Sequence, residues 1–325
     1  MTVAGEFRDA PVHLVTTWKE TSMASEAPLD CLIIGAGPAG LTAALYLKRF
    51  HRHVRVVDAG RSRALRIPRS WNLPGFPGGI GGQAFLARLR EQLAHLGCEV
   101  DSDEVTALSR HPEGGFEVRS AQRQWPARTV VLATGSRDKE ADLPGLPELR
   151  DAGLLRECPI CDAHEFSNQR IGVIGWSAHA AREALFLRHY SERVELLALR
   201  TPDDVAPDWL GDLDQRKVTW DATGMTRIHH RDRAVHVTLA DGSEKVFDVL
   251  YAALGCHPAS DLAHALKARC DPIGNLAIDA HCHTGVPGLY AAGDVTAGLD
   301  QVVVALAQGA IAATAIHNEL CGANR

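Results

Sequence analysis

The feature that most constrains this chain is a glycine-rich turn set between a strand and a helix. An apolar run, Leu32–Ile34, leads directly into Gly35–Gly40, which has the pattern G-x-G-x-x-G, and an Ala- and Leu-rich stretch follows over Leu41–Arg49. The next apolar run, Val54–Asp58, ends on an acidic residue 18 positions after Gly40. Strand, glycine turn, helix and second strand in this order form a βαβ unit that binds dinucleotides. The sequence therefore predicts an α/β fold built on a parallel sheet.

Each glycine of this turn has a physical reason. Gly35 permits the tight turn, Gly37 lets the backbone approach a pyrophosphate, and Gly40 lets the helix pack closely on the strand. The free amides and the positive end of the helix then face the anion, and the carboxylate that ends the second strand can accept a ribose hydroxyl. A turn used for packing alone is the alternative. The candidate nucleotide-binding residues are Gly35, Gly37, Pro38, Ala39, Gly40 and Asp58.

The same order recurs later in the chain and predicts a second dinucleotide-type unit. It consists of a strand over Ile171–Gly175, a helix over Ser177–Tyr190 and a strand over Val194–Leu197. A buried strand over Val130–Gly135 is expected between the two units. The chain has 325 residues, about twice the usual ~150 residues of one domain, so two domains are expected.

The first domain is expected to resume after the second one closes. Leu289–Asp294 is typical of another buried strand, and Asp300 can cap a long helix over Gln301–Leu320. Asp142–Gly145 is typical of a crossing between domains. We therefore predict two Rossmann-like, three-layer (ββα) dinucleotide-binding domains, the second inserted into the first. The predicted parts are a flexible N-terminal extension (1–28), a discontinuous first domain (29–140 and 253–325) and an inserted domain (141–252).

Composition excludes several classes of protein. A hydrophobic fraction of 46% and a charged fraction of 23% are those of a chain that buries a core, not of a disordered one. The net charge of −6 gives no general attraction to nucleic acid or to anionic membranes. No apolar run reaches the roughly 18 residues that span a bilayer, and residues 1–27 show neither a signal peptide nor an anchor. The eight cysteines lack the density of a secreted disulfide scaffold, so we expect a cytoplasmic protein.

Cys158-Pro159-Ile160-Cys161 is the only C-x-x-C in the chain, and it lies just before the second βαβ unit. This spacing allows both sulfurs to share one helical turn and to close a small disulfide. A helix N-terminus also lowers the pKa of a cysteine thiol. Asp162 follows directly, and like-charge repulsion from a thiolate would hold its proton more tightly, as a general acid requires. We predict Cys158, Cys161 and Asp162 as catalytic residues.

Two alternatives remain for the cysteine pair. As zinc ligands, the two cysteines would need two more donors, which His229–His230 or His281–His283 could supply only if the fold brought them close. The two sulfurs could otherwise be inert packing groups. No second C-x-x-C is present, so we predict no metal site. His164 is predicted to be a loop residue, and structural roles are assigned by default to Cys31, Cys98, Cys256, Cys270 and Cys282.

In combination, these motifs resemble the low-molecular-weight thioredoxin reductase family. The resemblance covers residues 29–320, and the family's motifs occur in its order and at about its spacings. They are Gly35–Gly40, Asn72–Pro77, Ala133–Gly135, Cys158–Asp162, Gly293–Val295 and Gln301. The pairing of the first glycine turn with Gly293-Asp294 is similar to the two-part FAD site of the pyridine nucleotide-disulphide oxidoreductases. The resemblance therefore implies that the first domain binds FAD.

The resemblance also implies roles for the matched residues. Asp294 would bind the ribityl chain, Cys161 would face the flavin, and Cys158 would exchange with a substrate disulfide. The helix that starts at Gln301 would point its positive end at the flavin pyrimidine. The partner would be a thioredoxin-like protein or a small dithiol, and the chain would form a homodimer whose inserted domain rotates relative to the FAD domain. The additional cofactor-binding residues are Asn72, Ala133, Thr134, Gly135, Gly293, Asp294, Gln301 and Val302.

The second glycine turn departs from the family pattern. Where the family has G-x-G-x-x-A, this chain has Gly175-Trp176-Ser177-Ala178-His179-Ala180. A Cβ at Ser177 stands where the backbone must approach a pyrophosphate, and the Trp176 indole could occupy the phosphate path. After the next strand, Leu199–Asp204 carries one arginine beside two aspartates, a poor site for a 2′-phosphate. We therefore do not expect conventional NADPH binding.

The leading hypothesis is an FAD-dependent thiol-disulfide oxidoreductase whose electron donor is NADPH, a ferredoxin or another flavin carrier. Relatives that lack the NADPH motifs include ferredoxin-dependent and deeply branching thioredoxin reductases and dithiol oxidases. The Cys-Pro-x-Cys form of the motif over Cys158–Cys161, together with Glu165, resembles the oxidase branch. Asp162 resembles the reductases instead. The alternatives are a dithiol oxidase that passes electrons to oxygen and a catalytically silent redox-sensing flavoprotein. Cys321, near the C-terminus, is assigned no function.

Overall fold

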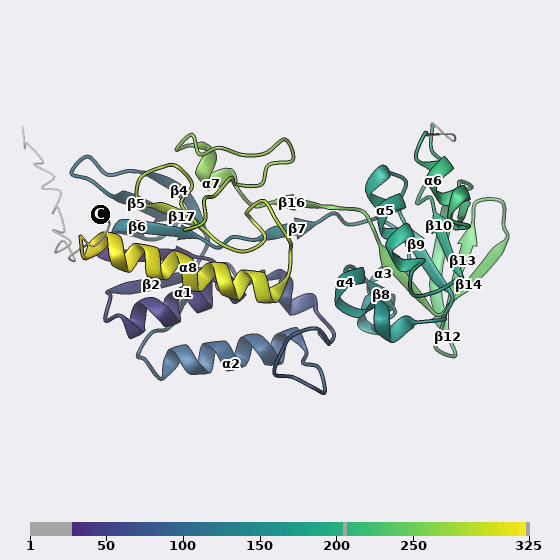
Figure 1. The fold of residues 1–325 in the computed structure, drawn as a ribbon, viewed down its shortest axis with the longest axis horizontal. Helices are drawn as coiled ribbons and strands as arrows, with labels where there is room; N and C mark the ends of the chain where they lie inside the picture. Colours follow the sequence, from purple (N-terminus) through teal and green to yellow (C-terminus); the bar gives the residue numbers. More distant parts are fainter. Residues whose placement is uncertain (1–27, 204–206, 323–325) are drawn as a thin grey trace, which may run out of the picture.

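A computed structural model describes residues 28–203 and 207–322 of the chain. The chain forms two bodies joined by a pair of extended connections (Figure 1). The predicted N-terminal extension lies outside the described residues except for Pro28, as do Asp204 and the tail beyond Gly322. Within the described ranges, no helix is both long enough and apolar enough to cross a membrane.

The first domain is built on a seven-stranded sheet in which β1 is paired with β2 on one side and with β6 on the other. β3 and β17 extend the parallel part of the sheet, and β5 and β4 continue it in antiparallel pairing beyond β6. The strands are β1 (Leu29–Ile34), β2 (Val54–Asp58), β3 (Val100–Ser102), β4 (Val105–Arg110), β5 (Phe116–Ser120), β6 (Gln124–Leu132) and β17 (Leu289–Ala291). The first βαβ unit therefore lies within the parallel part of the sheet, as predicted.

Three helices cover one face of this sheet, with α1 and α8 side by side (Figure 1). They are α1 (Pro38–Arg49), α2 (Gly82–Ala94) and α8 (Val302–Leu320); two short helical turns, η1 (Arg63–Arg66) and α7 (Asp261–His264), complete the domain. The helices approach closely because Gly309 of α8 faces α1. A Cβ at Gly309 would lie 2.3 Å from the Ala39 carbonyl oxygen, well inside contact distance. Only glycine fits at this position without a shift of the backbone.

The long C-terminal helix begins one residue later than predicted. Gln301, not Asp300, is its N-cap residue, and the helix runs over Val302–Leu320. The Asp300 carboxylate instead lies 3.5 Å from the Arg63 guanidinium, in an ion pair that draws it away from the helix. Among the described residues, no side chain caps the N-terminus of α8 by a hydrogen bond.

The inserted domain has three layers (Figure 1). A parallel sheet of order β11-β10-β9-β15-β8 has α5 and α6 packed on one face and an antiparallel sheet, β12-β13-β14, packed on the other. Its strands are β8 (Leu155–Arg156), β9 (Ile171–Ile174), β10 (Val194–Leu197), β11 (Thr219–Asp221), β12 (Met225–Arg231), β13 (Ala234–Leu239), β14 (Glu244–Phe247) and β15 (Val249–Ala252). Its helices are α3 (Leu146–Asp151), α4 (Pro159–Asp162), α5 (Ala178–Leu187) and α6 (Leu210–Gln215), with the 3₁₀ turn η2 (Ala163–Phe166). The predicted fold class, two dinucleotide-type α/β domains, is confirmed.

Two short strands connect the domains. β7 (Ser136–Asp138) leads out of the first domain, β16 (Cys256–Pro258) leads back, and the two pair in antiparallel fashion. The chain thus crosses before Asp142–Gly145, the predicted crossing. That turn lies inside the second domain because Leu143 is buried in its core. The domain boundaries near residues 140 and 253 stay predictions.

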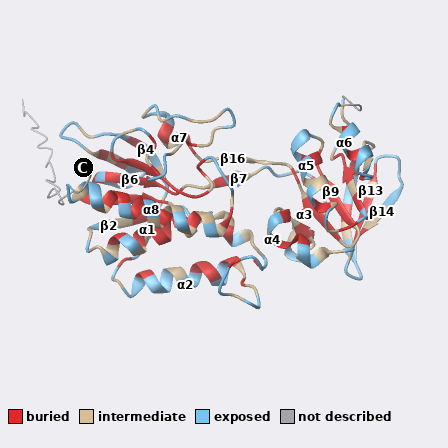
Figure 2. Ribbon diagram, viewed as in Figure 1, coloured by how far each residue is buried: buried red, intermediate tan, exposed pale blue. Residues whose placement is uncertain are grey.

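Burial follows the layers of both domains (Figure 2). Successive residues of a strand point to opposite faces of a sheet, so Leu32 and Ile33 of β1 enter different hydrophobic clusters. Ile33 packs with α1 and α8, whereas Leu32 packs with Phe116 on the opposite face. A strand buried on both faces must be apolar throughout, which explains the continuous apolar run that precedes the first glycine turn.

Candidate redox site between the two domains

A cavity of about 1410 Å³ lies between the domains and extends from the first glycine turn to the cysteine pair. It exceeds the roughly 300–1,000 Å³ of a pocket for one small ligand, so it has room for a dinucleotide beside a substrate. Of the predicted cofactor-binding residues, all but Gly40 line it, and so do Cys158, Cys161 and Asp162. The fold therefore gathers residues from two domains around a single space.

The first glycine turn fits a pyrophosphate. Gly35 has φ +104°, and a Cβ there would lie 2.3 Å from the Ala133 carbonyl oxygen. A Cβ at Gly40 would lie 1.9 Å from the Gly35 carbonyl oxygen, so this glycine serves the packing of α1 on the strand. Gly37 is different, because the nearest atom to an added Cβ is the Ser62 hydroxyl at 3.3 Å. Its missing side chain keeps the backbone open toward the cavity, as the approach of an anion requires.

The Asp58 carboxylate holds this glycine turn in place by hydrogen bonds. Its Oδ1 accepts a hydrogen bond from the Ala36 N–H at 3.1 Å, and its Oδ2 accepts one from the Arg90 guanidinium at 3.0 Å. The side chain is buried at the end of β2 and lines the cavity. The carboxylate thus fixes the glycine turn relative to β2, while its predicted contact with a ribose stays a prediction.

Asp294 lies at the other wall of the cavity, in a cluster of charges that centres on Arg63. The Arg63 guanidinium lies 3.2 Å from Asp294 and 2.8 Å from Asp138, and it also reaches Asp300. Burial opposes the charge of Arg63, but Asp138 and Asp294 outweigh it and raise the pKa of the guanidinium. Burial and repulsion from Asp294 raise the pKa of Asp300 to about 6. Arg63 was not foreseen because nothing in its local sequence indicates that three distant acids converge on it.

The cysteine pair closes the far end of the cavity. Cys158 and Cys161 form a disulfide at the start of α4. The Gln301 side-chain amide donates to both sulfurs, with Nε2 3.3 Å from the Cys158 Sγ and 3.5 Å from the Cys161 Sγ. Asn72 supports it by donating to the Gln301 Oε1 at 2.9 Å and to the Ile160 carbonyl at 3.4 Å. A disulfide of the inserted domain therefore rests on the first turn of α8 in the other domain.

Comparisons with known proteins agree with this arrangement. The chain matches the family described as "Pyridine nucleotide-disulphide oxidoreductase" over residues 29–309. It belongs to this family. The thioredoxin reductase of Treponema pallidum is 30% identical over 302 residues, which cover 89% of this chain and 96% of that protein.

Solved structures give the same result. The crystal structure of HlmI superposes with a TM-score of 0.83 at 31% identity and covers 91% of this chain and 94% of its own. The thioredoxin reductase of Streptococcus pyogenes superposes with a TM-score of 0.82 at 26% identity, covering 92% of this chain and 100% of its own. The predicted class, a flavin-dependent oxidoreductase that acts on thiols and disulfides, is confirmed at that level.

Asp162 is held in a buried polar contact that the sequence did not indicate. The Tyr251 hydroxyl donates to its Oδ1 at 2.7 Å, and the Arg156 guanidinium lies 3.4 Å from its Oδ2. Burial raises the pKa of the Asp162 carboxyl, and the Tyr251 hydrogen bond and the Arg156 charge only partly offset it. The direction agrees with the expectation for a general acid, but the cause is burial and not repulsion by a thiolate. Its catalytic role stays a prediction.

The second glycine turn carries a side chain, that of Ser177, at the position where the first turn has Gly37. Ser177 is the N-cap of α5, and its Oγ accepts a hydrogen bond from the Ala180 N–H at 3.2 Å. This bond uses one of the N–H groups that would face a phosphate, and the Ser177 side chain lines the cavity. The Trp176 indole is not placed in the phosphate path, because its ring packs edge-on against Trp209 and Trp220 at centroid distances of 5.2 and 5.9 Å.

An ion-pair network that the sequence did not predict links the domains beside the disulfide. Arg66, in η1 of the first domain, lies 3.2 Å from Glu157, the residue before Cys158, and 3.5 Å from Asp138 in β7. Burial raises the pKa of the Glu157 carboxyl, and the charges of Arg66 and Arg150 partly offset it. The network holds the segment before the disulfide against the first domain.

We predict that Asp162→Asn slows exchange with a dithiol by about 100-fold, because the amide cannot supply a proton to a leaving thiolate. Its oxygen can still accept the Tyr251 hydrogen bond. A raised pKa means that ionisation of Asp162 costs native stability as pH rises above the ordinary value of 3.8. The neutral variant should therefore gain thermal stability over the native chain between about pH 4 and about pH 8.

Anaerobic stopped-flow kinetics with dithiothreitol and thermal unfolding across this pH range measure both effects. Asp151→Asn, at an exposed position at the end of α3, is the matched control and should change neither. A variant that exchanges at the native rate would remove Asp162 from the reaction.

Proposed function

We propose that the chain binds FAD in the cavity between the domains and passes two electrons between the flavin and the Cys158–Cys161 pair. The observation that carries the proposal is the contact of Gln301 with both sulfurs, at one end of a cavity whose other wall is the open glycine turn. When bound, FAD would supply an acceptor or donor of two electrons. The first domain (29–140 and 253–325) would hold FAD, and the inserted domain (141–252) would carry the cysteine pair.

The residues that would hold FAD fall into two groups in the cavity wall, except for Gly40, which allows α1 to pack on the strand. The glycine turn and Asp58 would take the pyrophosphate and the ribose, and Asp294 would take the ribityl chain next to Arg63. The first turn of α8 has no side-chain cap, so its positive end would face the flavin pyrimidine. The proposed set is Gly35, Gly37, Pro38, Ala39, Gly40, Asp58, Asn72, Ala133, Thr134, Gly135, Gly293, Asp294, Gln301 and Val302.

The exchange with a dithiol uses only the residues of the cysteine pair and Asp162. A substrate thiolate attacks the Cys158 sulfur, the Cys158–Cys161 bond breaks, and Cys161 leaves as a thiolate that takes a proton from Asp162. The second substrate thiol then displaces Cys158, which yields the substrate disulfide and the reduced pair. The reverse sequence reduces a substrate disulfide. Gln301 and Asn72 position the two sulfurs of the closed disulfide by the hydrogen bonds already described.

The proposed partner is a thioredoxin-like protein or a small dithiol, and NADPH is not the proposed electron donor. Ser177 supports this exclusion, since it stands where the family pattern has a glycine, and its Oγ accepts a hydrogen bond from the Ala180 N–H. A ferredoxin or another flavin carrier would then supply electrons for disulfide reduction. The second candidate function, favoured by the same observation, is a dithiol oxidase in which oxygen removes the electrons. A silent redox sensor is a third, and the intact disulfide argues against it.

We predict that Cys161→Ser retains bound FAD but loses exchange with dithiothreitol by at least about 1,000-fold, because no disulfide can form. The measurement is anaerobic bleaching of the flavin absorbance by dithiothreitol. Cys256→Ser is the matched control, because Cys256 is a free cysteine that lines the same cavity. Native-rate bleaching in the Cys161→Ser protein would show that the pair is not in the electron path.

We predict that anaerobic NADPH and NADH bleach the bound flavin slowly or not at all, whereas a dithiol bleaches it completely. Titration of the holoprotein with all three reductants side by side gives the donor, and oxygen consumption with dithiol gives the direction. Rapid, stoichiometric bleaching by NADPH would contradict the inference drawn from Ser177. Absence of bleaching by every reductant would favour the sensor.

We also infer a cytoplasmic homodimer. Six cysteines are free alongside the one disulfide, which suits a reducing compartment. Large apolar side chains are exposed on the outer surfaces of α1 and α8, namely Tyr46, Val303 and Ile311, and such groups gather at subunit contacts. Light scattering should give twice the mass of one chain, and a monomer at micromolar concentration would refute the dimer. Cell fractionation tests the compartment.

A further inference from the structure

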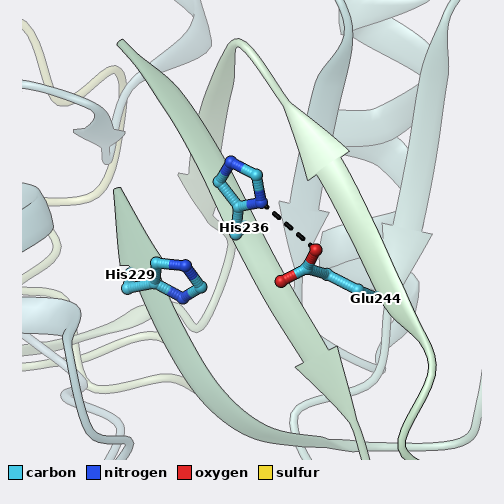
Figure 3. A group of neighbouring side chains, drawn as sticks. All are labelled: His229, His236 and Glu244. Atoms are coloured by element: carbon cyan, nitrogen blue, oxygen red, sulfur yellow. Dashed lines mark ion pairs between the residues drawn. The ribbon is translucent and has the colours of Figure 1, made fainter. Parts of the chain in front are cut away.

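A second cluster of chemically active side chains lies on the antiparallel sheet of the inserted domain, outside the cavity. His229 of β12 is directly opposite His236 of β13, and Glu244 of β14 is opposite Thr238, two residues from His236. Residues two apart on a strand share a face, so His229, His236 and Glu244 project from the same face of the sheet (Figure 3). The opposite face carries Ile228, Val235 and Val237 into the core of the domain.

The register also corrects the pairing of histidines considered from the sequence. His229 and His230 are adjacent in β12, so they point to opposite faces, and His230 is opposite Val235. These two histidines cannot bind one ion together. The partner that the sheet gives to His229 is His236, which lies seven residues away across a hairpin.

The cluster contains buried nitrogen atoms without hydrogen bonds. Within the part of the chain that the structure describes, the Nδ1 atoms of His229 and His236 are both buried and neither has a hydrogen-bond partner. His236 is only 7% exposed, and its Nδ1 lies 3.4 Å from a Glu244 carboxylate oxygen. The two imidazole rings are stacked with centroids 5.0 Å apart. Buried imidazole nitrogens without hydrogen bonds are unfavourable, and a bound cation would satisfy them.

The ligand atoms are close enough for one metal ion to reach all three once the side chains rotate. One ligand atom from each of the three residues lies within 4.8 Å of the others. In a tetrahedral zinc site with bonds of about 2.0–2.2 Å, ligand atoms are roughly 3.4 Å apart. Glu244 is half exposed, so its carboxylate can turn without disturbing the core. Two imidazoles and one carboxylate favour zinc or a similar transition metal over Mg²⁺ or Ca²⁺, which prefer oxygen ligands.

We propose that His229, His236 and Glu244 form a binding site for a divalent transition metal, zinc foremost, with one coordination position left open. The three residues come from three neighbouring strands, so the ion would tie β12, β13 and β14 together on the face turned away from the core. No residue of this site lines the cavity that holds the cysteine pair. Metal binding therefore stabilises the inserted domain whether or not the flavin is loaded.

The test is titration of the metal-free holoprotein, with its disulfide oxidised, with ZnCl₂ by isothermal calorimetry and with Co²⁺ by visible spectroscopy. We expect one zinc per chain with a micromolar or lower Kd and a higher melting temperature in excess zinc. The visible spectrum of the Co²⁺ form should show nitrogen and oxygen ligation without thiolate charge transfer.

Matched variants locate the site. His236→Gln and Glu244→Gln should each weaken zinc binding by at least tenfold, whereas His230→Gln, on the opposite face of β12, should leave it unchanged. Glu244→Gln also guards against misfolding, because this half-exposed side chain does not support the core. Native zinc affinity in both the His236→Gln and Glu244→Gln proteins, a thiolate signature with Co²⁺, or the absence of binding would each overturn the proposal.

Discussion

The contact between Gln301 and the two cysteine sulfurs is the interaction on which the proposed chemistry depends. It joins the first turn of α8 in one domain to the disulfide of α4 in the other, and Asn72 holds it from a third segment. Without this contact, the glycine turn and the disulfide would be two separate features on two separate domains. With it, the sulfurs lie in the same cavity as the residues that we propose bind a dinucleotide.

Ion pairs around this contact link the two domains. Within the first domain and its connection, Arg63 forms ion pairs with Asp138, Asp294 and Asp300. Arg66 forms an ion pair with Glu157 of the inserted domain. These groups are largely buried, so water screens their interactions less than it screens surface pairs. Loss of one partner would leave an uncompensated charge, which costs more than the pair itself contributes.

The two glycine turns show how one fold can keep an architecture and change its chemistry. Both turns join a strand to a helix, and both domains have a parallel sheet region with helices packed on one face. At Gly37 the missing Cβ leaves room, whereas at Ser177 a side chain lies at the equivalent place and caps the helix that follows. The Ser177 hydroxyl accepts a hydrogen bond from one N–H group of the first turn of α5, a kind of group that can also bind an anion.

The sequence alone determined both βαβ units, the insertion, the family and the disulfide, because periodicity, glycine spacing and the C-x-x-C motif are local. It placed the start of α8 one residue early and the domain crossing a few residues late. Only the tertiary structure decided that Gln301 meets sulfurs 143 and 140 residues away, that Tyr251 holds Asp162, and that His229 faces His236 instead of His230. Such contacts depend on domain packing and strand register, which bring together residues whose local sequences carry no sign of each other.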